Sequence, residues 1–418
     1  MRYNQTFLVR VLEIVGTVLV SLSAAQAQQE NLLYSFGPAG SNDGSGPVAG
    51  VVFDDAGNIY GTTEGGGANN NSGIVFELSP SNGAWAETIL YSFCALVKCA
   101  DGETAGSQLI FDAQGNLYGT TFAGGTGTNC PNGACGVVFE LSPPSYAGGN
   151  WTETVLWSFG TSLTDGCNPN ETLVWDAAGN LYGTTVSCGE NGRGTVFELT
   201  PSGAAWTETT LYNFCPSGLP CSDGAFPVGG GVIFDSAGNL YGTTQQGGIE
   251  DKGVVYKLSP PSSGGPWTDT TLYRFTKGGP GRNPQAGLSM DAAGNLYGTV
   301  SAGGLGNGGI FELTTSGVLH SFDFNGLDGA LPAAANPFID NRTKTLYSIT
   351  NGGGAKGGGT VFQIKGSMEK VLYNFCSQPQ CADGDAPSGS LTPRGGKLYG
   401  TAGAGGAYLN GAVFEIVP

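Results

Sequence analysis

The sequence contains few charged residues and almost no histidine. Charged residues make up 12% of the 418 positions, and His320 is the only histidine. His320 lies in a strand-like segment where similar segments carry tyrosine, so we expect it to be packed in the core. One packed histidine excludes Ser-His-Asp and Cys-His catalysis and a histidine-ligated metal centre. We therefore expect neither a cofactor nor a bound metal ion.

Basic residues are also scarce. Lysine and arginine number 16 against 33 aspartates and glutamates, which gives a formal net charge of −17. No segment concentrates the positive charges into a stripe. An acidic protein repels phosphate backbones, so the composition excludes a nucleic acid partner.

Long apolar runs are missing outside the first 27 residues. There, Arg2 and Arg10 precede an apolar segment at 11–25, and Ala25 and Ala27 stand at cleavage positions. This pattern predicts a signal peptide at 1–27. The alternative is an uncleaved membrane anchor, but the apolar run is shorter than the about 20 residues that a spanning helix needs. We expect the mature chain, 28–418, to be one extracellular or periplasmic domain, monomeric and without a transmembrane segment.

The ten cysteines support export. Eight of them form close pairs in the sequence, and the remaining two are left for each other. Zinc ligation is the alternative, but zinc sites favour shorter cysteine spacings and often histidine. In an exported chain the pattern predicts five disulfides: Cys94–Cys99, Cys130–Cys135, Cys167–Cys188, Cys215–Cys221 and Cys376–Cys381.

Glycine is abundant, with 74 residues, and it recurs within a repeated phrase. The phrase DAAGNLYGTT at 176–185 returns along the chain in closely similar forms. Its tyrosine marks seven copies spaced 50 to 64 residues apart, at Tyr60, Tyr118, Tyr182, Tyr241, Tyr297, Tyr347 and Tyr399. Regular self-similarity of this length indicates a repeat architecture.

Each copy contains four short apolar runs, a to d, separated by turn residues. In the second copy they lie at 107–112, 116–121, 136–142 and 151–159. Such runs are typical of strands, and four strands in each of seven copies predict an all-β, seven-bladed β-propeller. The last copy ends without a run d, and NLLYSF at 31–36 matches that run. We therefore expect the N-terminal strand to complete the last blade.

The repeated phrase itself has a structural explanation. Asp-x-x-Gly-Asn joins runs a and b, where Gly179 supplies the backbone freedom of a tight hairpin and Asp176 accepts bonds from the turn. Calcium binding is the functional alternative, but one carboxylate per turn is a poor ligand set. The phrase therefore serves as scaffold.

Several linked phrases, GNLYGTT, G-x-VFEL and LYSF, recur in the same order over nearly the whole mature chain. In this the sequence resembles the GloVer-type tandem repeats of exported bacterial proteins with a choice of surface anchors. The resemblance implies a β-propeller-like exported protein and assigns no catalytic residues. The chain departs from the family in ending at Pro418 within the last predicted blade, without an apolar tail or basic sorting end, so the resemblance does not extend to an anchor.

Propeller topology divides the loops between two faces. The d–a and b–c loops form one face, which we call the disulfide face because every cysteine falls in or beside these loops. The a–b and c–d loops form the other, the hairpin face. Stiffened loops bind ligands at lower entropic cost, so we expect function on the disulfide face. The alternative is that long glycine-rich loops simply need cross-links.

Acidic residues that break the repeat are the candidates for catalysis. The glutamate of the VFEL phrase and the Asp-Gly pair of the d–a loop recur, so both are scaffold. Carboxylates that stand outside the repeat on the disulfide face suit a polysaccharide hydrolase or lyase. The weak catalytic candidates are Glu64, Glu103, Glu171 and Glu190, and Glu250, Asp251 and Asp385 also break the repeat.

Aromatic residues outside the repeat are the candidates for ligand binding, because exposed rings serve as platforms for sugars. They are Phe122, Phe226, Phe324 and Tyr408. Each ring has an alternative role in filling a loop. The sequence as a whole favours a secreted protein that binds a glycan, a peptide or an envelope protein on its disulfide face. A carboxylate-based enzyme and a purely structural surface protein are the alternatives.

Overall fold

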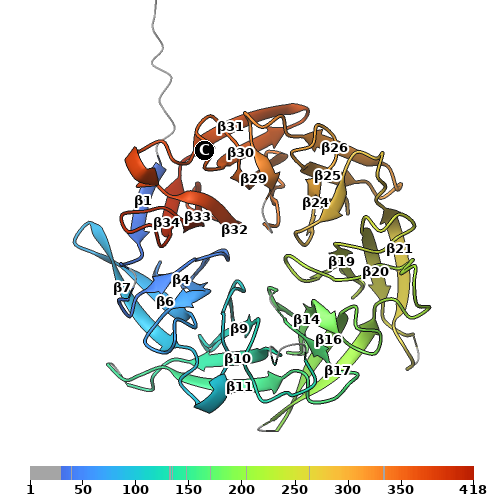
Figure 1. Ribbon diagram of the computed structural model, residues 1–418, viewed down its shortest axis with the longest axis horizontal. Coiled ribbons are helices and arrows are strands. Elements are labelled where there is room, and N and C mark those ends of the chain that lie inside the picture. The colour runs from blue at the N-terminus through green and yellow to red at the C-terminus, as the bar shows by residue number, and fades with distance from the viewer. Residues whose placement is uncertain are drawn as a thin grey trace, which may run out of the picture.

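Seven antiparallel sheets stand side by side in a closed ring (Figure 1). The computed structural model describes residues 30–418 except 39, 131, 132, 134, 147, 170, 204, 263, 333 and 334. The predicted signal peptide therefore lies outside the described residues. Within them, no helix is long and apolar enough to cross a membrane. The ring is a seven-bladed β-propeller, as the sequence predicts.

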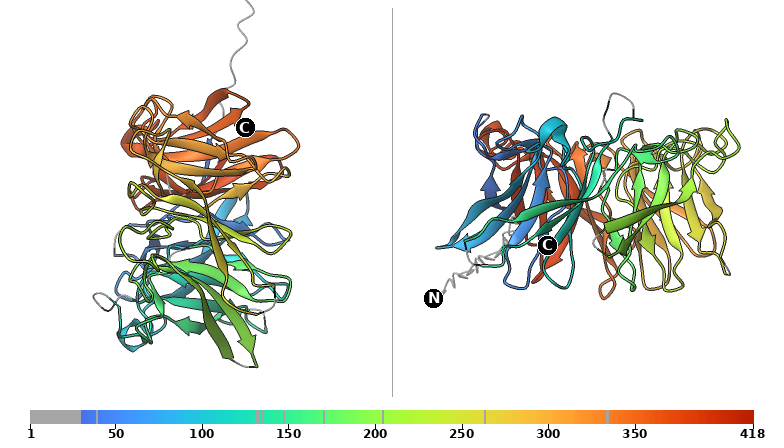
Figure 2. Two further views of the ribbon diagram at one scale, coloured as in Figure 1. Left: turned by 90° about the vertical axis from the view of Figure 1, so that its right-hand side faces the viewer. Right: turned by 90° about the horizontal axis from the view of Figure 1, so that it is seen from below.

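Each blade is a sheet with its strands in the order a, b, c, d. Strand a lies innermost, and the side views show loops projecting from both faces of the ring (Figure 2). The first four blades are β3 (Val52–Phe53), β4 (Ile59–Thr63), β6 (Ile74–Ser81) and β7 (Ala84–Ser92); β8 (Ile110–Phe111), β9 (Leu117–Thr121), β10 (Val137–Ser142) and β11 (Thr152–Ser158); β13 (Val174–Trp175), β14 (Leu181–Thr185), β16 (Thr195–Ser202) and β17 (Ala205–Asn213); and β18 (Ile233–Phe234), β19 (Leu240–Thr244), β20 (Val254–Ser259) and β21 (Thr268–Arg274).

Strand a is longer, or divided in two, in the other three blades. These blades are β22 (Arg282–Pro284) with β23 (Ser289–Met290), β24 (Leu296–Ala302), β25 (Gly309–Leu313) and β26 (Leu319–Asp323); β27 (Ala330–Pro332) with β28 (Phe338–Asp340), β29 (Thr345–Gly352), β30 (Thr360–Lys365) and β31 (Met368–Asn374); and β32 (Asp385–Arg394), β33 (Lys397–Ala404), β34 (Ala412–Ile416) and β1 (Glu30–Ser35). The loops add two short pairs, β2 (Gly44–Ser45) with β5 (Gly65–Gly66) and β12 (Gly166–Cys167) with β15 (Ser187–Cys188). Two 3-10 turns, η1 (Val97–Cys99) and η3 (Pro379–Cys381), complete the elements.

The N-terminal strand closes the ring. β1 pairs antiparallel with β34, so the first strand of the chain is strand d of the last blade. This confirms the predicted closure. Because β1 occupies the outer edge of the last blade, the same sheet contains both ends of the described chain (Figure 1).

The core lies between neighbouring blades and repeats around the ring. The phenylalanine that ends each strand d packs edge-on against the ring from strand c of the next blade. Ring centroids lie 4.9–5.3 Å apart at all seven interfaces. The pairs are Phe36–Phe76, Phe93–Phe139, Phe159–Phe197, Phe214–Tyr256, Phe275–Phe311, Phe324–Phe362 and Phe375–Phe414. The closing interface is therefore built like the other six.

The glycine of the YGTT phrase makes room for this core. Gly61 lies opposite Phe76 in its own sheet, and a Cβ on Gly61 would lie 2.6 Å from the tip of that ring. Gly183 is related to Phe197 in the same way. This glycine therefore accommodates an aromatic ring of its own blade.

One blade departs from the repeat and corrects two predictions. Strand d has a bulge in the other six blades, but β26 pairs with β25 without one and so lacks the bulged residue. Phe324 is therefore the core phenylalanine of this blade, 1% exposed and packed on Phe362, and cannot serve as a ligand platform. The same shift places His320 opposite Glu312 on the outer strand, where it is exposed rather than packed.

The side chains of each repeated hairpin form hydrogen bonds within that hairpin. In the first blade, Asp54 accepts hydrogen bonds from the backbone N–H groups of Gly57 and Asn58, the Asn58 side chain and the Tyr60 hydroxyl, at 2.7–3.2 Å. Both carboxylate oxygens are thus in use. Partial burial opposes ionisation, but these bonds prevail and lower the pKa of Asp54. The hairpins are therefore scaffold, and their carboxylates leave little capacity for a calcium ion.

A second set of carboxyl groups lies between the blades. Each strand-d acid faces the Asp-Gly aspartate of the preceding d–a loop. At the closing interface, the Tyr34 hydroxyl lies 2.9 Å from Asp43 Oδ2 and 3.2 Å from Glu87 Oε2. Burial, with a hydrogen bond and the charge of Asp43, raises the pKa of Glu87 to about 8. Two carboxyls that converge out of water hold a proton between them.

These interface acids recur at six of the seven interfaces. Burial first, and then the neighbouring aspartate, raises the pKa of the strand-d acid to between about 6 and about 8 in every pair. The pairs are Glu30–Asp383, Glu87–Asp43, Glu153–Asp101, Glu208–Asp165, Asp269–Asp223 and Glu369–Asp328. At the seventh interface Leu319 replaces the strand-d acid, and the preceding loop has no Asp-Gly pair. The two acids are therefore present or absent together.

Candidate functional site

Five disulfides join the loops of one face, in the five predicted pairings. No free cysteine is found among the described residues. Cys167 and Cys188 lie on β12 and β15 and connect a d–a loop to the b–c loop of the same blade. The other four pairs each close a single loop. The disulfides are therefore confined to the disulfide face, and they indicate an oxidising compartment.

One position of the repeat differs in every blade. It is the residue that directly follows the YGTT phrase, where strand b leads into the b–c loop. The seven residues at this rim position are Glu64, Phe122, Val186, Gln245, Ser301, Asn351 and Gly403. No two of them are the same residue type, although the phrase before them is nearly constant.

The backbone explains how this position can vary. The N–H of Glu64 donates to Gly46 O, and the N–H of Phe122 donates to Thr104 O, at 3.0–3.1 Å. The N–H groups of Val186 and Gln245 bind the d–a loop in the same manner. Because main-chain groups hold the rim in place, any side chain can occupy it without loss of the fold. This arrangement suits a recognition surface on a rigid scaffold.

The rim residues surround a cavity of about 700 Å³ at the centre of the disulfide face. We call it the central cavity. Its walls combine six of the rim residues with the segments that lead into strand a. The residues that line it are Val48, Ala49, Gly50, Glu64, Gly106, Gln108, Phe122, Glu171, Thr172, Val186, Val228, Gly229, Gly230, Gln245, Gln285, Ser301, Leu331, Pro332, Asn351, Ser388, Gly389 and Ser390.

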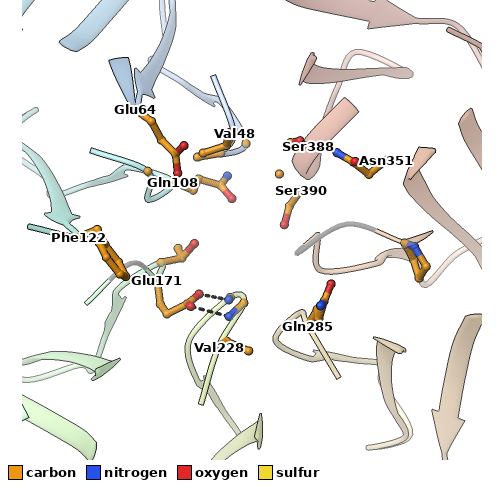
Figure 3. Close-up of a pocket in the computed structure, with 18 of the residues that line it drawn as sticks. Val48, Glu64, Gln108, Phe122, Glu171, Val228, Gln285, Asn351, Ser388 and Ser390 are labelled. Atoms are coloured by element: carbon orange, nitrogen blue, oxygen red, sulfur yellow. Dashed lines mark hydrogen bonds between the residues drawn. The ribbon is translucent and has the colours of Figure 1, made fainter. Parts of the chain in front are cut away.

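Side chains of opposite blades face each other across the cavity (Figure 3). Glu64, Gln108 and Phe122 lie on one side, and Gln285 and Asn351 lie on the other. Four side-chain amides and four hydroxyls lie among aliphatic residues, glycines and one aromatic ring, and the described lining has two carboxyls but no lysine, arginine or histidine. The central cavity therefore combines apolar walls with hydrogen-bonding groups, and its charged groups are acidic.

Glu171 is buried at the edge of the cavity, with 5% of its surface exposed. Its two carboxylate oxygens accept hydrogen bonds from the N–H groups of Gly229 and Gly230 in the next blade (Figure 3). Burial raises the pKa of Glu171 to about 7, although the N–H groups of the glycine segment lower it. The other blades have small residues in this place, such as Ala49 and Ser107. Glu171 thus fixes the neighbouring blade.

The glycine segment partly closes the cavity. Gly229 packs so tightly on Gln285 that a Cβ would lie 1.4 Å from its carbonyl oxygen. Asn336, two blades further on, donates from Nδ2 to Gly230 O at 3.4 Å and from its N–H to Ser390 Oγ at 2.9 Å. The Asn336–Gly230 bond joins two non-neighbouring blades, and together these contacts form a floor beneath the cavity.

The floor disturbs the regular contacts between blades. Thr62 and Thr243 donate from Oγ1 to a carbonyl of the next blade, at 2.7–2.9 Å. The equivalent Thr184 is buried and finds no partner in the described part of the chain. Its expected acceptor, Gly230, is turned towards Asn336 instead. Thr184 thus lacks the bond that Thr62 and Thr243 make, so the floor is a local feature of this interface and not of the repeat.

The predicted acids fall into two groups. Glu64 and Glu171 both line the central cavity, whereas Glu103 and Glu190 do not. Glu103 is half-buried and pairs through its backbone with Ala123, and Glu190 is exposed on a b–c loop. The four candidates therefore do not converge. Burial raises the pKa of Glu64 as well as that of Glu171.

The predicted aromatic residues are also dispersed. Phe122 lines the central cavity. Phe226 lies in a separate groove with the Arg193 guanidinium 5.1 Å from its ring centroid. Tyr408 is 54% exposed and lines none of the described cavities, and Phe324 belongs to the core. Sequence reasoning also missed Gln108, Gln285 and Ser390, which become visible only when the segments before strand a are aligned.

Metal binding finds no support in the described residues. Two groups of cysteine and acidic side chains lie close enough to hold an ion, but every cysteine in them belongs to a disulfide. A cysteine in a disulfide is not a thiolate ligand. The predicted absence of a metal site stays a prediction.

A comparison with known protein families shows to which family this chain belongs. The model of the Gloeobacter/Verrucomicrobia repeat matches residues 16–232, 101–306 and 266–418. The chain belongs to the Gloeobacter/Verrucomicrobia repeat family. The overlapping matches together cover all seven blades. No curated protein is similar enough in sequence to count as a relative.

Some solved structures are similar in fold to this protein although their sequences share little identity with it. A polysaccharide lyase is 12% identical with a TM-score of 0.50, covering 95% of this chain and 94% of that one. A puromycin hydrolase is also 12% identical, with a TM-score of 0.55, over 86% of this chain and 50% of that one. A protein of unknown function from Dyadobacter fermentans is 10% identical, with a TM-score of 0.43. At these identities the likeness concerns the fold alone.

Proposed function

We propose that this protein is an exported binding protein that holds a carbohydrate in the central cavity of its disulfide face. The observation that carries the proposal is the rim position, where seven copies of one repeat present seven different residues, six of which line one cavity. Positions that serve the scaffold carry the same residue in each copy, as the hairpins do. A surface that recognises one ligand needs side chains that differ from copy to copy on a backbone that stays in place, and the rim position has both properties.

The dimensions and chemistry of the cavity favour a sugar. Its volume of about 700 Å³ lies within the range of about 300 to 1,000 Å³ that is usual for small-ligand sites. Gln108, Gln285 and Asn351 offer both donors and acceptors to hydroxyl groups. Phe122 supplies an apolar ring beside them. The disulfides pre-order the surrounding loops, which lowers the entropy lost on binding.

Export and assembly belong to the same proposal. Residues 1–27 act as the signal peptide, and 28–418 form one domain that works as a monomer. The five disulfides support a location outside the cytoplasm.

A carboxylate-based hydrolase or lyase is the second candidate, because Glu64 and Glu171 line one cavity. The bonding of Glu171 argues against it. Both of its oxygens accept glycine N–H groups, so this carboxyl is not free to exchange protons with a substrate. Binding without turnover therefore accounts for the geometry better.

The test is a panel of oligosaccharides and polysaccharides titrated against the secreted protein. We expect at least one to bind at micromolar concentration, and Phe122→Ala to weaken it about tenfold, equal to about 1.4 kcal/mol. Tyr146→Ala is the matched control, since Tyr146 is an exposed aromatic of a c–d loop on the hairpin face. Binding that survives Phe122→Ala and is lost in Tyr146→Ala would contradict the proposal. Chromatography of the bound sugar tests the enzyme alternative, which requires shortened products.

A further inference from the structure

Glu64 is the one carboxyl of the central cavity without a partner. Its side chain makes no hydrogen bond or ion pair with any described residue, while Glu171 is bound by two N–H groups. Glu64 is half-buried, and its carboxyl points into the cavity towards Gln108 (Figure 3). Removing part of a carboxylate from water costs free energy, and no contact within the folded protein offsets that cost for Glu64.

No positive charge of the protein compensates Glu64. The described lining contains no lysine, arginine or histidine, and the two ion pairs of the described chain, Arg342–Asp340 and Lys397–Glu415, involve other residues. The whole chain carries a formal net charge of −17. Long-range attraction therefore concentrates cations, and the cavity offers them one unpaired carboxylate.

The type of cation follows from the other lining groups. Calcium takes about six to eight oxygen ligands, usually with several carboxylates, and Glu64 is the only unengaged one here. A protonated amine needs fewer partners and accepts one carboxylate with neutral oxygens around it. Gln108 lies beside Glu64 and Phe122 is the rim residue of the next blade, so an amide oxygen and an aromatic face are near. The neighbouring amides and hydroxyls then contact the remainder of a sugar.

We propose that the ligand of the central cavity is an amino sugar with a free, protonated amine, and that Glu64 binds this amine. The inference rests on the proposed carbohydrate site and names its chemical class. The site should therefore distinguish glucosamine-type oligomers from their N-acetylated forms, which have the same ring and linkage but no charge. Glu64 acts as the specificity-determining residue, while the amides and Phe122 contribute to the binding of both kinds of oligomer.

The experiment compares a glucosamine tetramer with an N-acetylglucosamine tetramer by calorimetry at about pH 6.5, where amines are still protonated and Glu64, whose pKa burial raises, is more fully ionised than in stronger acid. We expect the amine form to bind about tenfold more tightly or better, since a charge-assisted bond is about twice as strong as a neutral one. Equal affinities would overturn this inference and leave the carbohydrate site intact. Absence of binding by both tetramers would overturn the inference as well, whereas the wider panel decides the proposed function.

Two substitutions separate the charge of Glu64 from folding effects. Glu64→Gln keeps the shape, and we expect it to abolish the preference while retaining the affinity for the acetylated tetramer. Glu64→Lys is expected to reverse the preference in favour of an acidic oligomer such as tetragalacturonate. Glu190→Gln removes an exposed acid outside the cavity and is the matched control, with the preference unchanged. A preference for the amine that persists in both Glu64 variants would overturn the assignment.

Discussion

The a–b hairpins on one face carry nearly the same residues in five copies, whereas the rim position on the other face carries a different residue in every copy. In a hairpin, the conserved aspartate binds side chains of its own turn, as Asp54 does with Asn58 and Tyr60. At the rim, main-chain N–H groups bind the neighbouring loop whatever the side chain is, and the Ser301 and Asn351 side chains add a bond of their own. The comparison teaches that a repeat varies where the main chain, and not one particular side chain, carries the structural bond.

The disulfides sharpen the contrast, because they cross-link only the rim side. Cys167–Cys188 closes a loop of 21 residues, and Cys94–Cys99 closes one of 5. Replacing both Cys167 and Cys188 by serine is expected to lower the free energy of unfolding by about 3 kcal/mol, from loop-closure entropy. Denaturant unfolding measures this loss. The matched removal of Cys94 and Cys99 should cost about 2 kcal/mol, and an equal or larger loss there would contradict the loop-length argument.

Breaking a hairpin should affect stability and leave binding unchanged. Asp54→Ala removes the acceptor of four hydrogen bonds, so we expect a loss of about 1 to 2 kcal/mol in the free energy of unfolding. Asp55→Ala changes the adjacent aspartate, which is exposed and whose carboxylate makes no bond in the described structure, and should remain within about 0.5 kcal/mol of the wild type. Sugar affinity should be the same in both variants. A change in affinity for Asp54→Ala would mean that the hairpin face contributes to the site.

The two sets of structural carboxyls respond to pH in opposite directions. The folded protein lowers the pKa of four hairpin aspartates, so their contribution to stability is present above their ordinary pKa and is lost as the pH falls through the folded value. They are Asp54, Asp176, Asp235 and Asp291. It raises the pKa of the interface acids. Their contribution is complete below their ordinary pKa and is lost as the pH rises through about 6 to 8. The protein should therefore be most stable in mild acid.

Glu153→Gln tests the interface acids at one blade. Burial and the charge of Asp101 raise the pKa of Glu153 to about 8, so the wild type must place a second charge beside Asp101 at alkaline pH. We expect Glu153→Gln to raise the Tm by a few degrees at pH 9 and to leave it unchanged at pH 5. Thermal unfolding across this range measures the difference. The exposed Glu190→Gln should show no such pH dependence, and a uniform shift in Glu153→Gln would refute the raised pKa of Glu153 at this interface.

Local features of the fold were predictable because they depend on residues close in the sequence. The hairpin of Asp176 and the five disulfides fall in this class, and blade closure followed from the match of 31–36 to the missing strand. Phe324 and His320 were misplaced because β26 lacks the bulge of its counterparts, and a one-residue deletion inside a strand moves every side chain after it.

The site could be predicted only in part. Glu64, Phe122 and Glu171 stood out because they break the repeat, and all three line the central cavity. The structural role of Glu171 could not be predicted from the sequence, because its partners Gly229 and Gly230 lie 58 and 59 residues away in another blade. The interface acids left a signal that was missed: the strand-d acid and the Asp-Gly aspartate are absent together where Leu319 stands.

Hydrogen exchange with and without a saturating glucosamine tetramer tests the central claim most directly, because it reports on both faces in one measurement. The account predicts slower amide exchange at the walls of the central cavity, in segments 48–50, 64–66, 106–108 and 171–172, and unchanged exchange at the hairpins 54–58 and 112–116. Slower exchange at the hairpins with none at the cavity walls would contradict it.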